Sequence, residues 1–137
     1  MKIKLLSDSV KVPVKSHLPD VGLDIFLPED ITLQPLETKT VGLKLSVAIP
    51  EGFAGLLVPR SSIAEKGLII QTSIIDPDYT GEIHLIITNC SLIMQTAKKN
   101  DRLCSLVMFN ALNAYIEQVD ELTSTTRGTA GLGSSGK

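Results

Sequence analysis

The sequence predicts an all-β protein, an antiparallel sandwich or barrel, on the basis of three observations. Apolar residues occur in short runs, or alternate with polar residues, along most of the chain, which is the pattern of half-buried strands. Pro, Gly, Asp or Glu residues bound these runs, as turn residues do in all-β proteins. Aromatic residues make up only 4% of the chain, so Ile, Leu and Val must build the core, and β-branched Ile and Val favour pleated surfaces.

The predicted strands follow one another from the N-terminus to the last fifth of the chain. The first, at residues 2–6, alternates apolar and polar side chains. Short apolar or alternating runs then predict strands at residues 23–27, 31–33, 40–49, 53–58, 68–75, 82–88, 103–109 and 114–119.

Two segments depart from this pattern. Residues 60–67, Arg-Ser-Ser-Ile-Ala-Glu-Lys-Gly, combine a hydroxyl residue that can cap a helix, good helix formers and a final Gly, which predicts one or two helical turns. From Thr123 onward the chain is mainly Thr, Ser, Gly and Ala, and such a segment cannot bury enough surface to order itself. We therefore expect one β domain at residues 1–122 and a flexible C-terminal arm at residues 123–137.

Charge and composition exclude several classes of partner. The formal net charge is −2, so nothing attracts nucleic acid backbones or anionic membranes in general, and a polyphosphate would have to be held by a few placed Arg side chains and backbone donors. No apolar run approaches the length of a membrane span or a signal peptide core. Cys90 and Cys104 lie in apolar segments without metal-ligand spacing, which predicts buried, reduced thiols and a cytoplasmic location.

The most informative segment is Ile74-Ile-Asp-Pro-Asp-Tyr-Thr-Gly-Glu-Ile83. Apolar runs on both sides of Asp-Pro-Asp-Tyr-Thr-Gly predict a β-hairpin with an acidic tip. Pro77 restricts Asp76 to an extended conformation, and the two apolar residues before Asp76 favour its partial burial, which would make it a stronger base. The alternative is a hairpin whose acidic residues only cap the turn.

Two further segments could bind phosphate. Arg60 offers a planar set of donors, and Ser61 and Ser62 add hydroxyl groups at the start of the predicted helix. The alternative is a solvated helix start with a capping Ser. Near the C-terminus, Arg127 precedes a Gly-rich stretch whose amides could approach a phosphate closely, although such stretches are usually disordered linkers.

Three positions carry weaker signals. Asp24 lies in Val21-Gly-Leu-Asp-Ile25, and Asp101-Arg102 precedes a predicted strand. An adjacent Asp-Arg pair at a strand start is more often structural than catalytic. His84 lies in a strand, where a lone His is usually a cross-strand neighbour.

Taken in order, these segments resemble a known family. The motifs are Gly22-Leu-Asp24, Pro59-Arg-Ser-Ser62, Ile75-Asp-x-Asp-Tyr-x-Gly81, Asp101-Arg102, and Arg127-Gly followed by Gly131-Leu-Gly-Ser134. They are similar to the five motifs of trimeric dUTPases, and they span nearly the whole chain. The resemblance implies a homotrimer of distorted jelly-roll barrels, each with one short helix and a C-terminal arm. It also implies Mg²⁺-dependent hydrolysis of dUTP to dUMP and pyrophosphate.

The third motif implies the catalytic and base-binding residues. Asp76 matches the general base that orients a water for in-line attack on the α-phosphorus. Tyr79 matches the ring that packs under the deoxyribose and excludes a ribose 2′-hydroxyl. The main chain of residues 70–75, including Ser73, Ile74 and Ile75, matches the segment that pairs with the uracil edge, and His84 falls where another residue lines the base.

The other motifs imply phosphate and metal contacts. Arg60, Ser61 and Ser62 match contacts from a neighbouring subunit, and Ser105 occupies a position that contacts phosphate or metal-bound water. The arm residues that would close over the triphosphate are Arg127, Leu132, Gly133 and Ser134. Asp24 matches a residue that contacts Mg²⁺ through water.

Four positions depart from the family pattern. Ser73 and Ala130 stand where Gly is usual, Ser105 stands where Gln is usual, and Leu132 stands where a Phe stacks on uracil. Leu132 can cover the base but loses aromatic stacking of roughly 1 kcal/mol. Ser105 is too short to reach as Gln does, unless a water bridges the gap. We therefore expect an active enzyme with weakened nucleotide affinity.

A purely structural jelly roll would not explain Arg127 and the Gly-rich end of the chain. Two alternatives with a biochemical function also remain at this stage. The same substitutions would also suit a nucleotide-binding regulatory homologue with weak or no turnover. A dCTP deaminase is the other alternative, but those enzymes place a catalytic Glu near the end of the strand after the acidic turn. Here the only acid of that predicted strand, Glu82, is at its start.

Overall fold

The computed structural model describes residues 1–112 and 114–130, which form eleven strands and one helix. In chain order the elements are β1 (Lys2–Leu5), β2 (Leu23–Phe26), β3 (Ile31–Leu33), β4 (Thr38–Gly42), β5 (Leu45–Ala48), β6 (Phe53–Pro59), α1 (Ser61–Ala64), β7 (Leu68–Ile70), β8 (Ser73–Ile75), β9 (His84–Asn89), β10 (Gln95–Ala97) and β11 (Arg102–Asn110). The prediction of an all-β chain with one short helix is confirmed.

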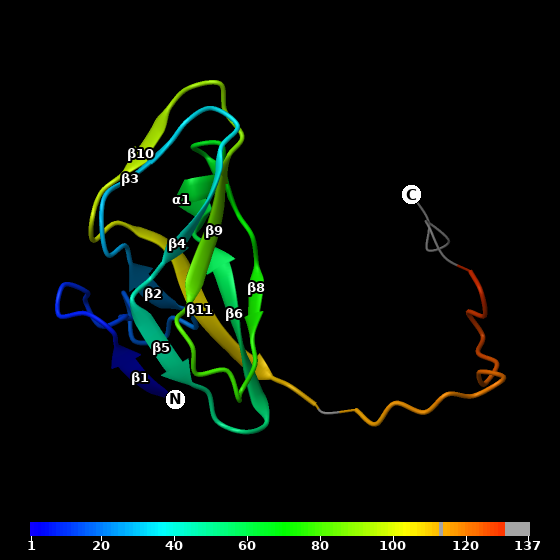
Figure 1. Cartoon of the computed structure of the whole chain (residues 1–137). Coiled ribbons are helices and arrows are strands. Elements are labelled where there is room, and N and C mark those ends of the chain that lie inside the picture. The colour runs from blue at the N-terminus through cyan, green and yellow to red at the C-terminus, as the bar shows by residue number, and fades with distance from the viewer. Residues whose placement is uncertain (113, 131–137) are drawn as a thin grey trace.

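Long-range antiparallel pairing gives the chain a jelly-roll architecture (Figure 1). The largest sheet has the order β2-β11-β6-β8, and a second has the order β4-β9-β7. Two smaller sheets pair β1 with β5 and β10 with β3. Strands from distant parts of the chain are therefore neighbours, and the last strand, β11, lies at the centre of the largest sheet.

An aliphatic core fills the space between the sheets, as the low aromatic content predicts. Leu33, Leu45, Leu57, Leu85 and Ile87 are completely buried. Each such side chain contributes roughly 1.5–3 kcal/mol through the removal of apolar surface from water. The core holds in place the strands that surround the candidate site.

The predicted strand boundaries are wrong in three places. Residues 40–49 were expected to form one run, but they divide into β4 and β5 at a turn where Lys44 has a φ of +56°. Residues 68–75 divide into β7 and β8, which join different sheets. Residues 114–119 form no strand within the described chain, because no edge strand of the same chain pairs with them. The short, polar strand β10 was not predicted.

The helix lies at the predicted place but begins differently. Its N-cap is Arg60, which makes no side-chain capping hydrogen bond, so the expected hydroxyl cap is absent. Gly67 ends the segment with a φ of +70°, a conformation that glycine adopts without steric cost. The short helix therefore places Arg60 directly at the end of β6.

The two thiols lie in different environments. Cys104 is buried in β11, and burial, with a smaller effect of the Asp24 charge, raises the pKa of its thiol to about 12. Cys90 is exposed at the end of β9, so the prediction of two buried thiols is correct only for Cys104.

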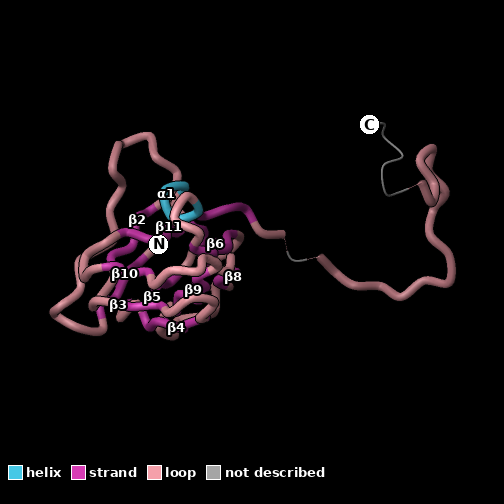
Figure 2. Tube along the Cα trace, turned by 90° about the horizontal axis from the view of Figure 1, so that it is seen from above, coloured by secondary structure: helices cyan, strands magenta, loops and turns pink. Residues whose placement is uncertain are grey.

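After β11 the chain leaves the body of the protein (Figure 2). Residues 114–130 are exposed throughout, and the side chains of Tyr115 and Ile116 are fully accessible. Apolar side chains are costly to leave in water, so this segment has a surface suited to contact with another chain. No helix in the described part of the chain is long and apolar enough to cross a membrane.

Candidate functional site

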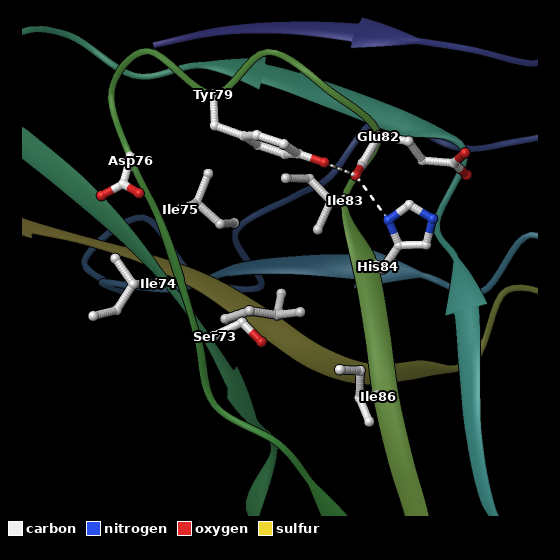
Figure 3. A pocket seen from close by; sticks show the side chains of 10 residues that line it. Ser73, Ile74, Ile75, Asp76, Tyr79, Glu82, Ile83, His84 and Ile86 are labelled. Carbon is white, nitrogen blue, oxygen red and sulfur yellow. Dashed lines mark hydrogen bonds between the residues drawn. The ribbon is translucent and has the colours of Figure 1, made fainter.

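A pocket of about 230 Å³ opens where β8 and β9 separate (Figure 3). Just before β8, the backbone N–H of Gln71 still donates a hydrogen bond to Ile86 O of β9 at 2.9 Å. Beyond this bond β8 turns to pair with β6, while β9 pairs with β4. The two strands beside the acidic turn thus belong to different sheets, and the prediction of a simple hairpin is wrong because each strand pairs elsewhere.

The pocket brings together most of the residues predicted from the third motif. The predicted residues that line it are Ser73, Ile74, Ile75, Asp76, Tyr79 and His84. The structure adds four that the sequence prediction missed, namely Leu57, Glu82, Ile83 and Ile86. The period of two along β9 could have identified Ile86, because it lies two residues after His84 on the same face.

The walls of the pocket are largely aliphatic and its rim is polar. Leu57, Ile75 and Ile83 are buried, whereas Asp76, Tyr79 and His84 are exposed around the opening. An apolar slot with polar groups at its edge is suited to a flat, partly polar ring.

The side chains of Tyr79 and His84 meet at one carbonyl group. Tyr79 OH donates to Glu82 O at 2.7 Å, and His84 Nδ1 lies 2.9 Å from the same oxygen. A carbonyl oxygen only accepts hydrogen bonds, so His84 Nδ1 is the donor in this contact. One backbone group therefore orients two side chains of the pocket.

Glu82 is itself held in place by Lys44. The backbone N–H of Lys44 donates to Glu82 Oε1 at 3.0 Å, and Lys44 Nζ lies 3.5 Å from that oxygen. These contacts, the backbone bond first, keep the pKa of the Glu82 carboxyl below its ordinary value. The charged Glu82 side chain thus fixes the corner that carries the shared carbonyl.

Asp76 lies at the start of the acidic turn with an exposed carboxylate. The turn is closed by a hydrogen bond from Tyr79 N–H to Asp76 O at 3.1 Å. The expected partial burial of Asp76 is wrong for the isolated chain, because Ile75 points into the core but Ile74 is 65% exposed on the other face. The carboxylate is free to contact a ligand at the mouth of the pocket.

A second polar cluster surrounds Asp24, which is only 7% exposed. Arg102 Nη1 donates to Asp24 Oδ2 at 3.0 Å, and Arg60 Nε lies 3.5 Å from Oδ1. Ser105 Oγ donates to Oδ1 at 2.7 Å, and Ser16 Oγ donates to Oδ2 at 3.2 Å. Parts of the first, second and fourth motifs therefore converge on one carboxylate.

Two polar hollows flank this cluster. One, of about 380 Å³, is lined by Asp24, Arg60, Ser105 and neighbouring residues of the 16–22 segment. The other, of about 350 Å³, is lined by Arg60, Ser62, Lys66, Arg102 and adjacent residues. In the second hollow, the guanidinium and ammonium groups beside a hydroxyl favour an anionic ligand, whereas the first is also lined by the carboxylates of Asp20 and Asp24. Ser61 is exposed at the first position of α1 but lines neither hollow.

Asp101, the first residue of the fourth motif, has a structural role. Its carboxylate accepts a hydrogen bond from Lys98 N–H at 2.8 Å and so closes the turn before β11. Only its neighbour Arg102 joins the Asp24 cluster.

The pocket and the arginine cluster are separate within one chain. None of the described residues lines both the pocket beside Asp76 and either hollow beside Arg60. The expected arm residues also lie apart from both: Arg127 is exposed and its Nε donates to Ala130 O at 3.0 Å. Leu132, Gly133 and Ser134 lie outside the described residues.

The described part of the chain contains no group of three or more His, Cys, Asp or Glu side chains that could hold a metal ion. Asp24, the residue expected to contact Mg²⁺ through water, has both carboxylate oxygens engaged by the four side chains described above.

Comparison with known proteins identifies relatives of one kind. The dUTPase family model matches residues 8–136. A deoxyuridine 5′-triphosphate nucleotidohydrolase of Leifsonia xyli subsp. xyli is 39% identical over 130 residues, which cover 92% of this chain and 86% of that protein. The enzyme of the same name from Saccharomyces cerevisiae is 36% identical over 138 residues, covering 99% of this chain and 94% of its own.

Solved structures agree with the sequence comparison. The dUTPase of Staphylococcus bacteriophage 80alpha with dUPNHPP superposes with a TM-score of 0.94 at 31% identity, covering 99% of this chain and 98% of that one. A variant dUTPase from phage phi11 of S. aureus, described as revealing the coordination of a structural Mg(II) ion, has a TM-score of 0.82 at 28% identity. That match covers 88% of this chain and 96% of the phage protein.

Proposed function

The chain belongs to the dUTPase family, and on this premise we propose that it hydrolyses dUTP to dUMP and pyrophosphate. The observation that carries the proposal is the pocket between β8 and β9, which has Asp76 at its mouth and Tyr79 and His84 at its rim. An aliphatic slot for a base thus lies beside a carboxylate that can activate water.

Asp76 is the proposed general base. Its carboxylate takes a proton from a water molecule as the water oxygen attacks the α-phosphorus of dUTP. The new bond joins this oxygen to phosphorus, and the bond to the bridging oxygen breaks, so pyrophosphate leaves with the electron pair. Proton transfer of this kind contributes roughly 10²–10⁴-fold to the rate.

The uracil base of the nucleotide would be selected by the main chain and side chains of the pocket. We propose that the main chain of β8, at Ser73, Ile74 and Ile75, pairs with the uracil edge, and that His84 lines the base. A base that presents the wrong donors leaves buried groups unpaired, which costs about 1–3 kcal/mol for each group. The aliphatic walls limit the space for a larger base.

The sugar would pack against Tyr79, and Gly81 determines where this ring lies. A Cβ atom at Gly81 would come within 2.7 Å of Tyr79 Cζ and the phenolic oxygen. Gly81→Ala should therefore displace the ring and break its hydrogen bond to Glu82 O. We expect the ratio of kcat/KM for dUTP to kcat/KM for UTP to fall by about tenfold, because the ring no longer excludes the 2′-hydroxyl. Steady-state kinetics with both nucleotides measure this ratio.

Thr80→Ala is the matched control, since Thr80 is exposed in the same turn and the change adds no atoms near the ring. It should leave the ratio unchanged. An unaltered ratio in Gly81→Ala would show that Tyr79 does not select the sugar.

The phosphates would be bound by a neighbouring subunit in a homotrimer. Arg60, with Ser61 and Ser62, is proposed to contact the triphosphate held in another subunit's pocket. The separation of the pocket from the arginine cluster within one chain supports this arrangement. We propose further that the arm at residues 123–137 closes over the triphosphate through Arg127, Leu132, Gly133 and Ser134. Light scattering at micromolar concentration should give the mass of a trimer, and a monomeric mass would refute this assembly.

Mg²⁺ is proposed to enter with the nucleotide. The ion prefers phosphate oxygens and water to a protein cage, whereas the oxygens of Asp24 already accept from two hydroxyl groups and Arg102 and form an ion pair with Arg60. The described side chains therefore do not fit a metal site of their own. When bound, the ion would neutralise charge on the leaving pyrophosphate.

The proposed activity is tested by pyrophosphate release. We expect the protein with Mg²⁺ to release pyrophosphate from dUTP and to act far more slowly on dTTP, dCTP and UTP. Formation of dUTP from dCTP would instead indicate a deaminase, although Glu82 precedes β9 and is engaged by Lys44. Absence of pyrophosphate from dUTP would overturn the proposal.

One observation favours a regulatory role as the second candidate. The Ser105 hydroxyl donates to Asp24 and does not extend toward a ligand as the usual Gln would. Among the solved relatives, the 80alpha phage dUTPases are described as controlling transfer of virulence genes. Tight dUTP binding without pyrophosphate release would favour this candidate over the enzyme.

A further inference from the structure

We propose that Ser105 is a positioning residue for triphosphate binding: its hydroxyl helps to fix the Asp24 carboxylate on which the guanidinium groups of Arg60 and Arg102 converge. The inference rests on the proposed function, which assigns Arg60 to the phosphates, and it extends that role to Arg102. It concerns a position at which this chain has Ser in place of the family's usual Gln.

Each oxygen of Asp24 contacts one hydroxyl group and one guanidinium group. Oδ1 accepts from Ser105 Oγ at 2.7 Å and lies 3.5 Å from Arg60 Nε. Oδ2 accepts from Ser16 Oγ at 3.2 Å and from Arg102 Nη1 at 3.0 Å. The shortest of the four contacts is the one made by Ser105, so this hydroxyl has the best geometry to hold the carboxylate.

A bulge in β11 makes the arrangement possible. Ser105 lies directly opposite Asp24 in the pairing of β11 with β2. In a regular strand, Arg102 and Ser105 would point to opposite faces of the sheet because they are three residues apart. The register shifts between Arg102 and Cys104, and the extra residue turns Arg102 to the same face as Ser105.

Arg60 is brought to this point from the other side of β11. The strand β6 ends at Pro59, opposite Cys104, and the backbone N–H of Arg60 donates to Leu103 O at 3.0 Å. Its Nη1 also donates to Arg102 O at 3.4 Å. The bulged residue therefore anchors the Arg60 backbone, and Asp24 anchors its side chain.

The side chain at position 105 packs against Gly22. Gly22 lies so close that a Cβ atom there would be 3.1 Å from Ser105 Cβ. The short Ser side chain places its hydroxyl against Asp24. Because this donor carries no charge, the negative charge of the carboxylate still balances the positive charge of the arginines.

The consequence for binding is preorganisation. Each guanidinium group has five N–H donors, and the contacts with Asp24 use only part of them. The remaining donors are available to phosphate oxygens, and both arginine side chains are about one-third exposed. Arginines that are already fixed lose less conformational freedom when a triphosphate binds.

The test compares Ser105→Ala with Ser105→Thr, which keeps the hydroxyl. Dissociation constants for dUTP and dUMP are measured by calorimetry in EDTA, so that the metal plays no part. We expect Ser105→Ala to weaken dUTP binding by about tenfold, as for the loss of one hydrogen bond to a charged group, and to leave dUMP binding nearly unchanged. With Mg²⁺, KM for dUTP should rise more than kcat falls. Ser105→Thr should restore most of the affinity.

Ser9→Ala, an exposed serine in the turn after β1, is the control for loss of a surface hydroxyl and should bind as the parent does. Melting temperatures of all variants separate a folding defect from a local one. Equal weakening of dUTP and dUMP binding in Ser105→Ala, or no weakening of either, would overturn the inference. A parent protein that binds dUTP but releases no pyrophosphate would refute the proposed activity and leave this binding test decisive. A parent that binds neither nucleotide would overturn both.

Discussion

Asp76→Asn should lower kcat for dUTP hydrolysis by about 10²–10⁴-fold, because the amide of Asn has the size of the carboxylate but cannot take the proton of water. The Asp76 side chain is exposed, so the amide can be solvated and the fold should be unaffected. The dissociation constant for dUTP should therefore stay within a few-fold of the parent value. Pyrophosphate release measures the first effect, and calorimetry measures the second.

Asp78→Asn is the matched control for this change. Asp78 lies in the same turn, is also exposed, and loses the same charge on substitution. It lines the open surface beside Asp76 and Pro77 but not the pocket between β8 and β9. We expect only a small change in kcat. Similar losses in both variants would mean that the turn acts through its net charge, and undiminished turnover in Asp76→Asn would remove Asp76 from the mechanism.

Six of the ten residues that line the pocket could be predicted from sequence because they belong to one short segment. Ser73 to His84 form one continuous segment, and the fixed φ of Pro77 with the apolar runs on either side restricts its conformation. These short-range rules restrict the turn that begins at Asp76, whereas the roles of Tyr79 and His84 were implied by the resemblance to dUTPases. The same rules predicted a hairpin, which is wrong because β8 pairs with β6 and β9 pairs with β4 instead of with each other.

The Asp24 cluster could not be predicted from residue patterns alone. Asp24, Arg60 and Ser105 come from distant parts of the chain, and only strand pairing brings them together. The position of Arg102 depends on a β-bulge, and no residue type in this segment predicts that bulge. The exposure of Asp76 was also missed. The two apolar residues before Asp76 favoured its partial burial, but a strand turns Ile74 and Ile75 to opposite faces, and Ile74 is exposed.

Removal of residues 123–137 should reduce kcat/KM for dUTP by roughly 10²-fold or more. Without the arm to cover it, the triphosphate is poorly oriented for in-line attack. The described residues of this segment, 123–130, are exposed and lie away from the body, so the truncated chain should keep the melting temperature of the parent. Arg127→Ala in the full chain should show part of the loss, and Arg127→Lys should recover some of it. A truncated protein with parental kcat/KM would exclude the arm from the site.

A mixture of two impaired proteins then tests whether the arm serves a neighbour. Asp76→Asn subunits have an intact arm but no base, and truncated subunits have the base but no arm. If the arm of one subunit completes the pocket of another, mixed trimers made by refolding the two proteins together should regain activity. About one quarter of the sites in a random equal mixture would then combine the base of one subunit with the arm of its neighbour. If each arm folded over its own pocket, no site would contain both parts and the mixture would be as inactive as its components. The exposed apolar side chains of Tyr115 and Ile116 are suited to contact with another chain, and the pocket shares no residue with the arginine cluster, so we expect recovery.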